Sequence, residues 1–342
     1  MTLAPTLAAV AAERQRLEAL LPAFLDGLCR PGSPYGRCRF HTRQEQPWLL
    51  YASQQALSMA VLHGPWDRLD AARRAEWLDL FAAAQDPVTG LFRCPVAVDE
   101  PVAYYRAITI KLARRLQSIG RRPTHPLPRA DEVCPTLAEL PAALAQLPWD
   151  TQTYSSGSQA GHWAMTRVGE LQDRGEPLGD DAYLRQVTGF LEERQHAETG
   201  LWGASPRLDD GVNGLLKTLS VYQEMARPLP RPEAIVDSLL RLQGKDGGFG
   251  DACTPWNTLG LLTFLRRQTP YRGDEIGVAA LATVPSLAAR RQSDGLYSAT
   301  ATGCLAVHAG VRLCHAPQPV GDIQGTSQTL SILKMVEDLA AP

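Results

Sequence analysis

The amino-acid sequence predicts an all-α protein, specifically an (α/α)6 toroid built from helical hairpins. Apolar residues recur at helical spacing along most of the 342 residues, and no stretch shows the apolar–polar alternation typical of a strand. A short motif also repeats: a glutamine, a polar turn with glycine, a hydrophobic residue and an aromatic residue. Copies occur at residues 85–95, 195–202, 243–255 and 292–297.

The spacing of the motif indicates the size of the repeating unit. Gln195, Gln243 and Gln292 are 48 and 49 residues apart, and Gln85 precedes Gln195 by 110 residues, about two periods. Self-similarity of this length indicates one helical hairpin per repeat, stacked on its neighbours. Both terminal helices carry apolar faces, which an open solenoid would expose. We therefore predict a closed ring of six hairpins and a terminal helix around a central cavity.

The individual helices follow from the same apolar periodicity. Pro47 occupies a tolerated first-turn position, and Ser156 or Ser158 is suited to cap the helix that follows it. Residues 29–40 are rich in turn formers, and the Pro-rich stretch 121–134 is an irregular connection within a single domain over residues 1–342. Helices are expected over residues 4–28, 47–63, 68–84, 101–118, 137–147, 156–171, 181–195, 210–225, 232–243, 255–267, 275–291, 300–313 and 326–339.

Composition excludes several classes of function. With a net charge of −2, the chain does not show the excess of basic residues that is typical of nucleic-acid-binding proteins. Seven scattered cysteines without a C-x-x-C pair favour reduced thiols in the cytoplasm over a disulfide framework. Residues 1–25 form an amphipathic pattern with internal charges, unlike a signal peptide. No apolar run approaches the roughly 20 residues that a membrane-spanning helix needs.

The repeated glutamine, glycine and aromatic residues resemble the QW-type motif of the terpenoid cyclase and protein prenyltransferase superfamily. This resemblance implies an α/α toroid with a central cavity, and it indicates the fold more than the activity because such toroids host unrelated chemistries. We interpret the motif side chains themselves as turn and packing residues. They are Gln195, Trp202, Gln243, Phe249, Gln292 and Tyr297.

In such a ring, each motif brings the N-terminus of an inner helix to one rim. Helix N-termini carry free N–H groups and partial positive charge, so this rim is the predicted binding site. Aromatic walls suit an apolar or cationic guest, and sugar rings also stack on them. The predicted substrate-binding residues are Trp48, Tyr51, Tyr104, Tyr105, Tyr154, Gln159, Trp163, Asn213, Trp256 and Asn257.

Asp209 and Asp210 are the first candidates for catalysis. The resemblance implies a D-x-D-D segment after a QW-type turn, and residues 207–210 match its last two positions, with Asp209 in the place of the proton donor and Asp210 in support. Arg207 stands where the family has its first aspartate, and we expect a nearby arginine to lower the pKa of Asp209. The alternative interpretation is that Asp209 caps the helix and Asp210 lies in its first turn.

A zinc site of the prenyltransferase type is not expected. That family binds zinc through an aspartate, a cysteine two residues later and a histidine from a later helix. Asp210 matches the first ligand, but Val212 and Asn257 stand in the other two positions.

Two further pairs consist of residue types that bind metals. Cys304 and His308 lie four apart on a predicted helix, which is metal-competent spacing, but a third ligand is missing and core packing is favoured. Cys314 and His315 resemble the Cys-His pair of the lanthionine cyclases, which are zinc-containing helical toroids. We predict no metal and no other cofactor.

His162 is the other candidate for acid–base chemistry, three residues after Gln159 on one helical face; a half-buried structural histidine is the alternative. The function expected first is a terpenoid-cyclase-like cytoplasmic enzyme that binds an apolar or isoprenoid-type small molecule and performs acid-initiated cyclisation or rearrangement, with Asp209 as donor. The first alternative is a carbohydrate-active toroid, a lyase or hydrolase, using His162 and Asp209. The second is a non-catalytic ligand-binding toroid.

Overall fold

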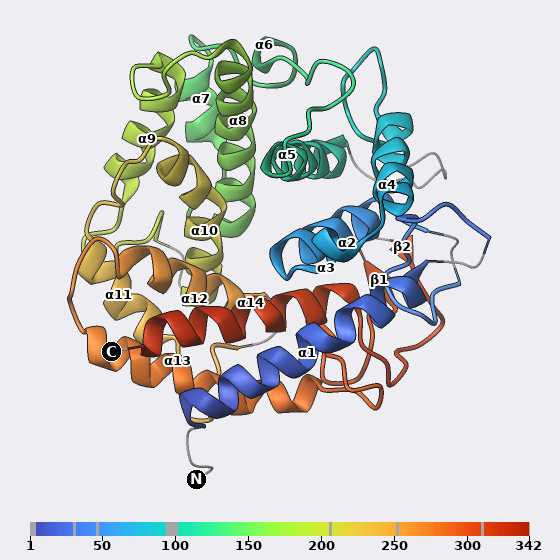
Figure 1. Cartoon of the computed structure of the whole chain (residues 1–342). Helices are drawn as coiled ribbons and strands as arrows, with labels where there is room; N and C mark the ends of the chain where they lie inside the picture. The colour runs from blue at the N-terminus through green and yellow to red at the C-terminus, as the bar shows by residue number, and fades with distance from the viewer. Residues whose placement is uncertain are drawn as a thin grey trace. The chain divides into compact units, whose positions relative to one another are not determined.

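The structure is a computed structural model that describes residues 5–29, 32–45, 48–93, 102–204, 207–250, 253–308 and 311–341. Helices dominate this part of the chain (Figure 1), so the all-α prediction is confirmed. The elements are α1 (Leu7–Leu28), α2 (Leu50–Leu62), α3 (Pro65–Arg68), α4 (Ala71–Ala84), α5 (Val102–Ser118), α6 (Ala130–Val133), α7 (Leu140–Gln146), α8 (Thr153–Arg174), α9 (Ala182–Arg194), α10 (Leu208–Glu224), α11 (Pro232–Arg241), α12 (Thr254–Leu265), α13 (Gly273–Leu287), the 3₁₀ turn η1 (Ala288–Arg290), β1 (Val307–His308), β2 (Val311–Arg312) and α14 (Ile323–Ala340).

Most of the predicted helices are present, with boundaries shifted by a few residues. The helix predicted over residues 68–84 corresponds to α4, which begins at Ala71, while Arg68 ends the separate short helix α3. Helix α8 begins at Thr153, and Ser156 is buried inside it, so the prediction that Ser156 or Ser158 caps this helix is wrong. Gly175 ends α8 with a positive φ of 67°, a conformation that glycine adopts without a steric penalty.

The helix predicted over residues 300–313 is wrong. Gly303 has a φ of 123°, which no right-handed helix contains, and a Cβ there would lie 2.3 Å from the Gln318 carbonyl oxygen. The chain then forms the antiparallel pair β1–β2, with Val307 opposite Arg312 and His308 opposite Val311. Cys304 and His308 therefore do not share a helix face.

The chain divides into two compact units. Unit 1 comprises Met1–Val10, Pro128–Ser286 and Lys334–Pro342, and unit 2 comprises Ala11–Leu127 and Leu287–Leu333. One boundary falls within the irregular connection predicted at residues 121–134. The single domain predicted over residues 1–342 stays a prediction.

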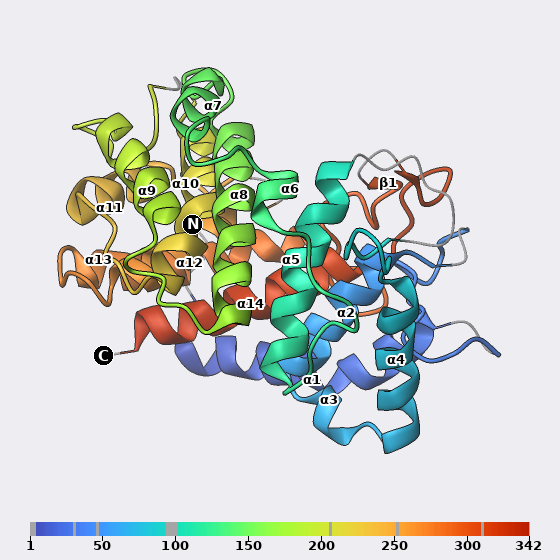
Figure 2. The ribbon, with the colours of Figure 1, turned by 90° about the horizontal axis from the view of Figure 1, so that it is seen from above.

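Unit 1 repeats a hairpin in which every second helix runs in the same direction. Helices α8, α10 and α12 lie next to one another, while α9 and α11 are the returning helices between them (Figures 1 and 2). Gly157 lies against Gly214, and Gly161 against Lys217, so α8 and α10 are parallel and close. Asn213 bonds to Asn257, which shows that the first turns of α10 and α12 are level.

The side-chain amide of the repeated glutamine forms hydrogen bonds both within its own turn and to a later segment of the chain. Gln195 Nε2 donates to the carbonyl oxygens of Gly200 at 2.8 Å and of Pro230 at 2.7 Å. The amides of Gln85 and Gln243 do the same, each to a glycine carbonyl in its own turn and to a second carbonyl, that of His125 or Ala279. The interpretation of these glutamines as turn residues is confirmed.

The aromatic residue of the motif packs in the core. Trp202 is fully buried, pairs with Gln195 across an isolated β-bridge, and donates from Nε1 to Thr218 Oγ1 at 2.9 Å. Phe249 is equally buried. Gln292 departs from the pattern, because its amide bonds to Arg290 and Ser298 within its own turn.

Replacing Gln195 by glutamate is expected to lower the free energy of unfolding by about 3 kcal/mol, because a carboxylate has no donor for two buried carbonyl oxygens. Gln195→Ala removes the donor without adding charge, so we expect a smaller loss, of about 2 kcal/mol. Urea denaturation measures both. The matched control is Gln117→Glu on an exposed helix face, where the change should stay within about 0.5 kcal/mol. Equal losses at residues 195 and 117 would contradict the role of the amide.

Candidate functional site

The predicted rim in unit 1 begins with an aspartate that caps a neighbouring helix. Asp210 Oδ2 accepts from the Thr153 N–H at 2.7 Å, and Oδ1 accepts from the Tyr154 N–H at 3.3 Å. Asp210 lies in the first turn of α10, as one interpretation held, but its carboxylate serves the N-terminus of α8. This role was missed because the partner lies 57 residues away.

Amide groups continue the rim onto α12. Asn257 Nδ2 donates to Asn213 Oδ1, and Asn213 Nδ2 lies 3.4 Å from Thr254 Oγ1. The structure therefore brings together Asp210, Asn213 and Asn257, three of the residues predicted from the helix starts.

Asp209 is an ion-paired carboxylate at the same end of α10. Arg207 NH2 lies 2.8 Å from Asp209 Oδ2, and the Asp209 side chain is 39% exposed. The hydrogen bond from Arg207 lowers the pKa of Asp209, as the sequence predicts. The N-cap position of α10 is Arg207, so Asp209 does not cap this helix. In this state Asp209 accepts hydrogen bonds and does not hold a proton at neutral pH.

Two aromatic side chains are exposed on the first turns of α8 and α12. Tyr154 is 44% exposed with Lys217 Nζ 4.8 Å from its ring centroid, and Trp256 is 37% exposed. Gln159, His162 and Trp163 are half-buried further along α8.

His162 and Asp209 lie at different levels of the neighbouring helices α8 and α10. His162 follows Thr153 by nine residues on α8, which places it about 13 Å along the helix axis. Thr153 is level with Asp210, because that carboxylate accepts its N–H. His162 is therefore about 13 Å along the α8 axis from the level of Asp210 and its neighbour Asp209.

The remaining aromatic residues predicted to line the cavity belong to unit 2. Trp48 is buried under the Arg37 guanidinium, 5.8 Å from its ring centroid. Tyr51 stacks on Phe40 and lies 4.4 Å from the His308 ring centroid. Tyr105 is half-buried on α5, and the Tyr104 side chain lies outside the described residues. The continuous aromatic wall stays a prediction.

His308 makes unit 2 sensitive to acid. Burial lowers its pKa from 6.5 to about 4, with a smaller contribution from Lys111. The folded state thus binds fewer protons than the unfolded state between these values. Stability is fully present above pH 6.5 and is lost as the pH falls toward 4, by up to about 3 kcal/mol.

His308→Phe keeps the ring between Phe40 and Tyr51 and removes the titrating group. Urea denaturation from pH 7 to pH 4 should therefore show a smaller loss of stability for the variant than for the wild type. Parallel pH profiles would contradict the assignment to His308.

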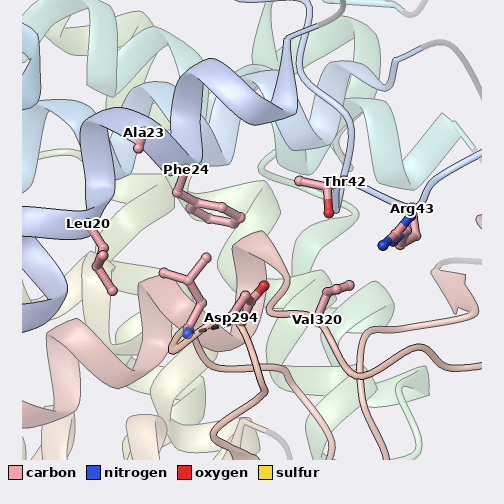
Figure 3. Close-up of a pocket in the computed structure, with 8 residues that line it drawn as sticks. Leu20, Ala23, Phe24, Thr42, Arg43, Asp294 and Val320 are labelled. Atoms are coloured by element: carbon pink, nitrogen blue, oxygen red, sulfur yellow. Dashed lines mark hydrogen bonds between the residues drawn. The ribbon is translucent and has the colours of Figure 1, made fainter.

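A hollow in unit 2 was not predicted from the sequence. It has a volume of about 500 Å³, and Phe24 points into it from α1, opposite Asp294 and Val320 (Figure 3). Asp294 is held in place, because its carboxylate accepts from the N–H groups of Leu296 and Gly321. Arg43 makes no hydrogen bond or ion pair within the described part of the chain. The lining residues are Leu20, Ala23, Phe24, Thr42, Arg43, Asp294, Leu296 and Val320.

A second, more polar hollow of about 420 Å³ shares Arg43 and Val320 with the first. It is lined further by Glu45, Ser293, Cys314, His315, Gln318 and Pro319. The first hollow is built by α1 together with loops from distant parts of the sequence, and the second by loops. Helical periodicity carries no signal for such sites.

The chain matches no protein-family model and no curated protein. None of the helices in the described ranges has the length and apolar character needed to cross a membrane. The six cysteines in these ranges are free thiols, while Cys94 lies outside them.

Proposed function

We propose that this chain binds an apolar, isoprenoid-type small molecule that carries an anionic group, in the 500 Å³ hollow of unit 2. The observation that supports this proposal is the lining: apolar side chains from α1 and two loops face one another, and Arg43, which has no protein partner within the described part of the chain, lies beside them. The volume falls within the range of about 300–1,000 Å³ that small-molecule sites occupy.

The apolar lining supplies the affinity for a hydrocarbon body. Leu20, Phe24, Leu296 and Val320 remove the ligand's surface from water, which is worth about 25 cal/mol per Å². Arg43 supplies the match for a carboxylate or phosphate, because a guanidinium binds such groups with paired N–H donors. Asp294 does not compete for Arg43 in this arrangement, since two backbone N–H groups already hold its carboxylate.

The toroid is part of the same proposal. The parallel helices α8, α10 and α12, separated by α9 and α11, are what a ring of hairpins requires. The shared glutamine contacts at three turns also support the resemblance to the QW-type superfamily.

The resemblance also implies a reaction at the predicted rim of unit 1, namely acid-initiated cyclisation or rearrangement with Asp209 as the donor and Asp210 in support. The Gln195 turn precedes these aspartates as that family requires, but a proton donor at Asp209 requires its pair with Arg207 to open. Asp209→Asn should then abolish turnover and leave the free energy of unfolding within about 0.5 kcal/mol, since the side chain is exposed. Turnover by this variant at the wild-type rate would eliminate the mechanism.

Binding is tested with farnesyl phosphate and farnesol by isothermal titration. We expect the phosphate ester to bind more tightly, and Arg43→Ala to weaken it about tenfold while leaving farnesol unchanged. Leu20→Asn should weaken both ligands. Arg121→Ala, on an exposed segment outside the hollow, is the matched control. Failure of both ligands to bind, or equal effects at Arg43 and Arg121, would refute the proposal.

A carbohydrate-type ligand is the second candidate, and the rim of unit 1 favours it. Exposed Tyr154 and Trp256 stand beside the amides of Asn213 and Asn257, an arrangement suited to stacking and to hydroxyl recognition. Thermal-shift measurements with a panel of sugars test this candidate. Protection that disappears in Trp256→Ala would support it.

A further inference from the structure

Three side chains of types that can bind a metal lie close together in unit 2, and none of them is among the residues predicted to be catalytic. One ring nitrogen of His41 and the Sγ atoms of Cys304 and Cys314 all lie within 4.8 Å of one another, and all three side chains are buried. They come from the loop before α2 and from both sides of the β1–β2 pair. We propose that His41, Cys304 and Cys314 form a zinc site.

The donor set and its dimensions suit zinc. Thiolate and imidazole ligands are those that zinc prefers, and bond lengths of about 2.0–2.3 Å place tetrahedral ligands roughly 3.5–3.8 Å apart. A contraction of about 1.0–1.3 Å at most in the ligand-to-ligand distances therefore converts the observed cluster into a coordination sphere. Side-chain rotation is sufficient for a change of that size.

The two ring nitrogens of His41 differ in their surroundings. Nε2 lies 3.1 Å from the Leu305 carbonyl oxygen, while Nδ1 is buried without a hydrogen-bond partner in the described part of the chain. Burial lowers the pKa of His41 to about 4, so the ring is neutral and offers a lone pair. An unpartnered buried nitrogen costs free energy that a bound cation recovers.

A second layer of contacts holds the loop that presents these ligands. The Leu305 N–H donates to Asp322 Oδ2, and Asp322 is fully buried, so a chain of contacts runs from His41 through Leu305 to this carboxylate. A histidine that binds zinc usually donates its other ring N–H to a carboxylate, a backbone carbonyl or water. Here the Leu305 carbonyl is in that position for His41.

Each thiol that binds zinc loses its proton. The Gln318 N–H lies 3.4 Å from Cys304 Sγ, a contact that stabilises a thiolate, while burial raises the pKa of Cys304 to about 11. Cys314 Sγ lies 3.1 Å from the Ala316 carbonyl oxygen, to which a thiol donates. Binding of Zn²⁺ therefore forms two Zn–S bonds and one Zn–N bond and releases two protons to solvent.

The polar hollow of about 420 Å³ borders the cluster. Cys314 lines this hollow, and so does Gln318, whose N–H contacts Cys304 Sγ. With three protein ligands the fourth position is left to a water molecule or a bound ligand, as in zinc sites that perform chemistry. His315, the neighbour of Cys314 in the predicted Cys-His pair, is 82% exposed and lies outside the cluster, as does His308.

The test uses the full chain, stripped of metal with a chelator and titrated with Zn²⁺ against a chromophoric competitor. We expect one ion per chain and a thiolate charge-transfer absorption when Co²⁺ replaces Zn²⁺. Cys314→Ser and His41→Gln should each weaken binding at least 100-fold. Cys253→Ser, outside the cluster, should have no effect. Wild-type affinity in Cys314→Ser, or no binding to the wild type, would overturn the proposal.

Thiol alkylation followed by peptide mapping keeps the test independent of whether a variant folds. Zn²⁺ should protect Cys304 and Cys314 in the wild-type protein and leave Cys253 unchanged. Cys29 and Cys38, whose sulfur atoms are 3.9 Å apart, are the competing pair. Protection of that pair alone would overturn the assignment. Neither measurement uses an isoprenoid ligand, so a failed isoprenoid titration leaves this result unaffected.

Discussion

Replacing Gly157 by alanine is expected to lower the free energy of unfolding by about 3 kcal/mol, at the upper end of the cost of overpacking. A Cβ at this position would lie 2.4 Å from the Gly214 carbonyl oxygen, and backbone cannot rotate away as a side chain does. Gly161 meets the Lys217 carbonyl oxygen at 2.3 Å in the same way. Helices α8 and α10 must therefore separate to accept a methyl group.

The matched control is Gly189→Ala in the interior of α9, where no atom lies within 4 Å of the added Cβ. There the substitution should raise the free energy of unfolding by about 0.5–1 kcal/mol, because alanine has the higher helix propensity and loses less backbone entropy on folding. Urea denaturation measures both variants. A gain in stability for Gly157→Ala, like the gain expected for Gly189→Ala, would show that α8 and α10 are not in backbone contact.

The sequence predicts local features of this fold well, because apolar periodicity and turn glycines act over a few residues. Helices α1, α9, α10 and α14 follow directly from that periodicity. Over residues 300–313 the apolar spacing is also helical, yet the described residues there form a turn and the β1–β2 pair. The positive φ of Gly303 and its approach to Gln318 decide the outcome there, and both depend on a segment that the local pattern does not include.

The same distinction separates the parts of the candidate sites. The effect of Arg207 on Asp209 was predicted because the two residues are neighbours in the chain. The role of Asp210 at the start of α8 was not, because its partners lie 56 and 57 residues away. His41 reaches Leu305 across 264 residues, so no spacing rule points to the cluster that it forms with Cys304 and Cys314.

The final prediction concerns the buried carboxylate behind that cluster. The backbone N–H groups that donate to Asp322 include those of Gly325 at 2.7 Å, Ala299 at 3.1 Å and Leu305 at 3.2 Å. Burial raises its pKa to about 6 against the opposing effect of these donors. Asp322→Ala leaves all three donors without a partner in the interior. We expect a loss of about 4 kcal/mol in the free energy of unfolding, since each buried unsatisfied group costs about 1–3 kcal/mol.

Asp70 provides the comparison, because it caps α4 at the surface through one contact, to the Arg73 N–H at 2.8 Å. Asp70→Ala should cost about 1 kcal/mol, the usual value of an exposed cap. Asp322→Asn keeps one acceptor oxygen and should fall between the two, at about 2 kcal/mol. Guanidinium denaturation ranks the three variants. If Asp322→Ala costs no more than Asp70→Ala, the carboxylate does not hold the loop at Leu305, and the orientation of His41 must depend on other contacts.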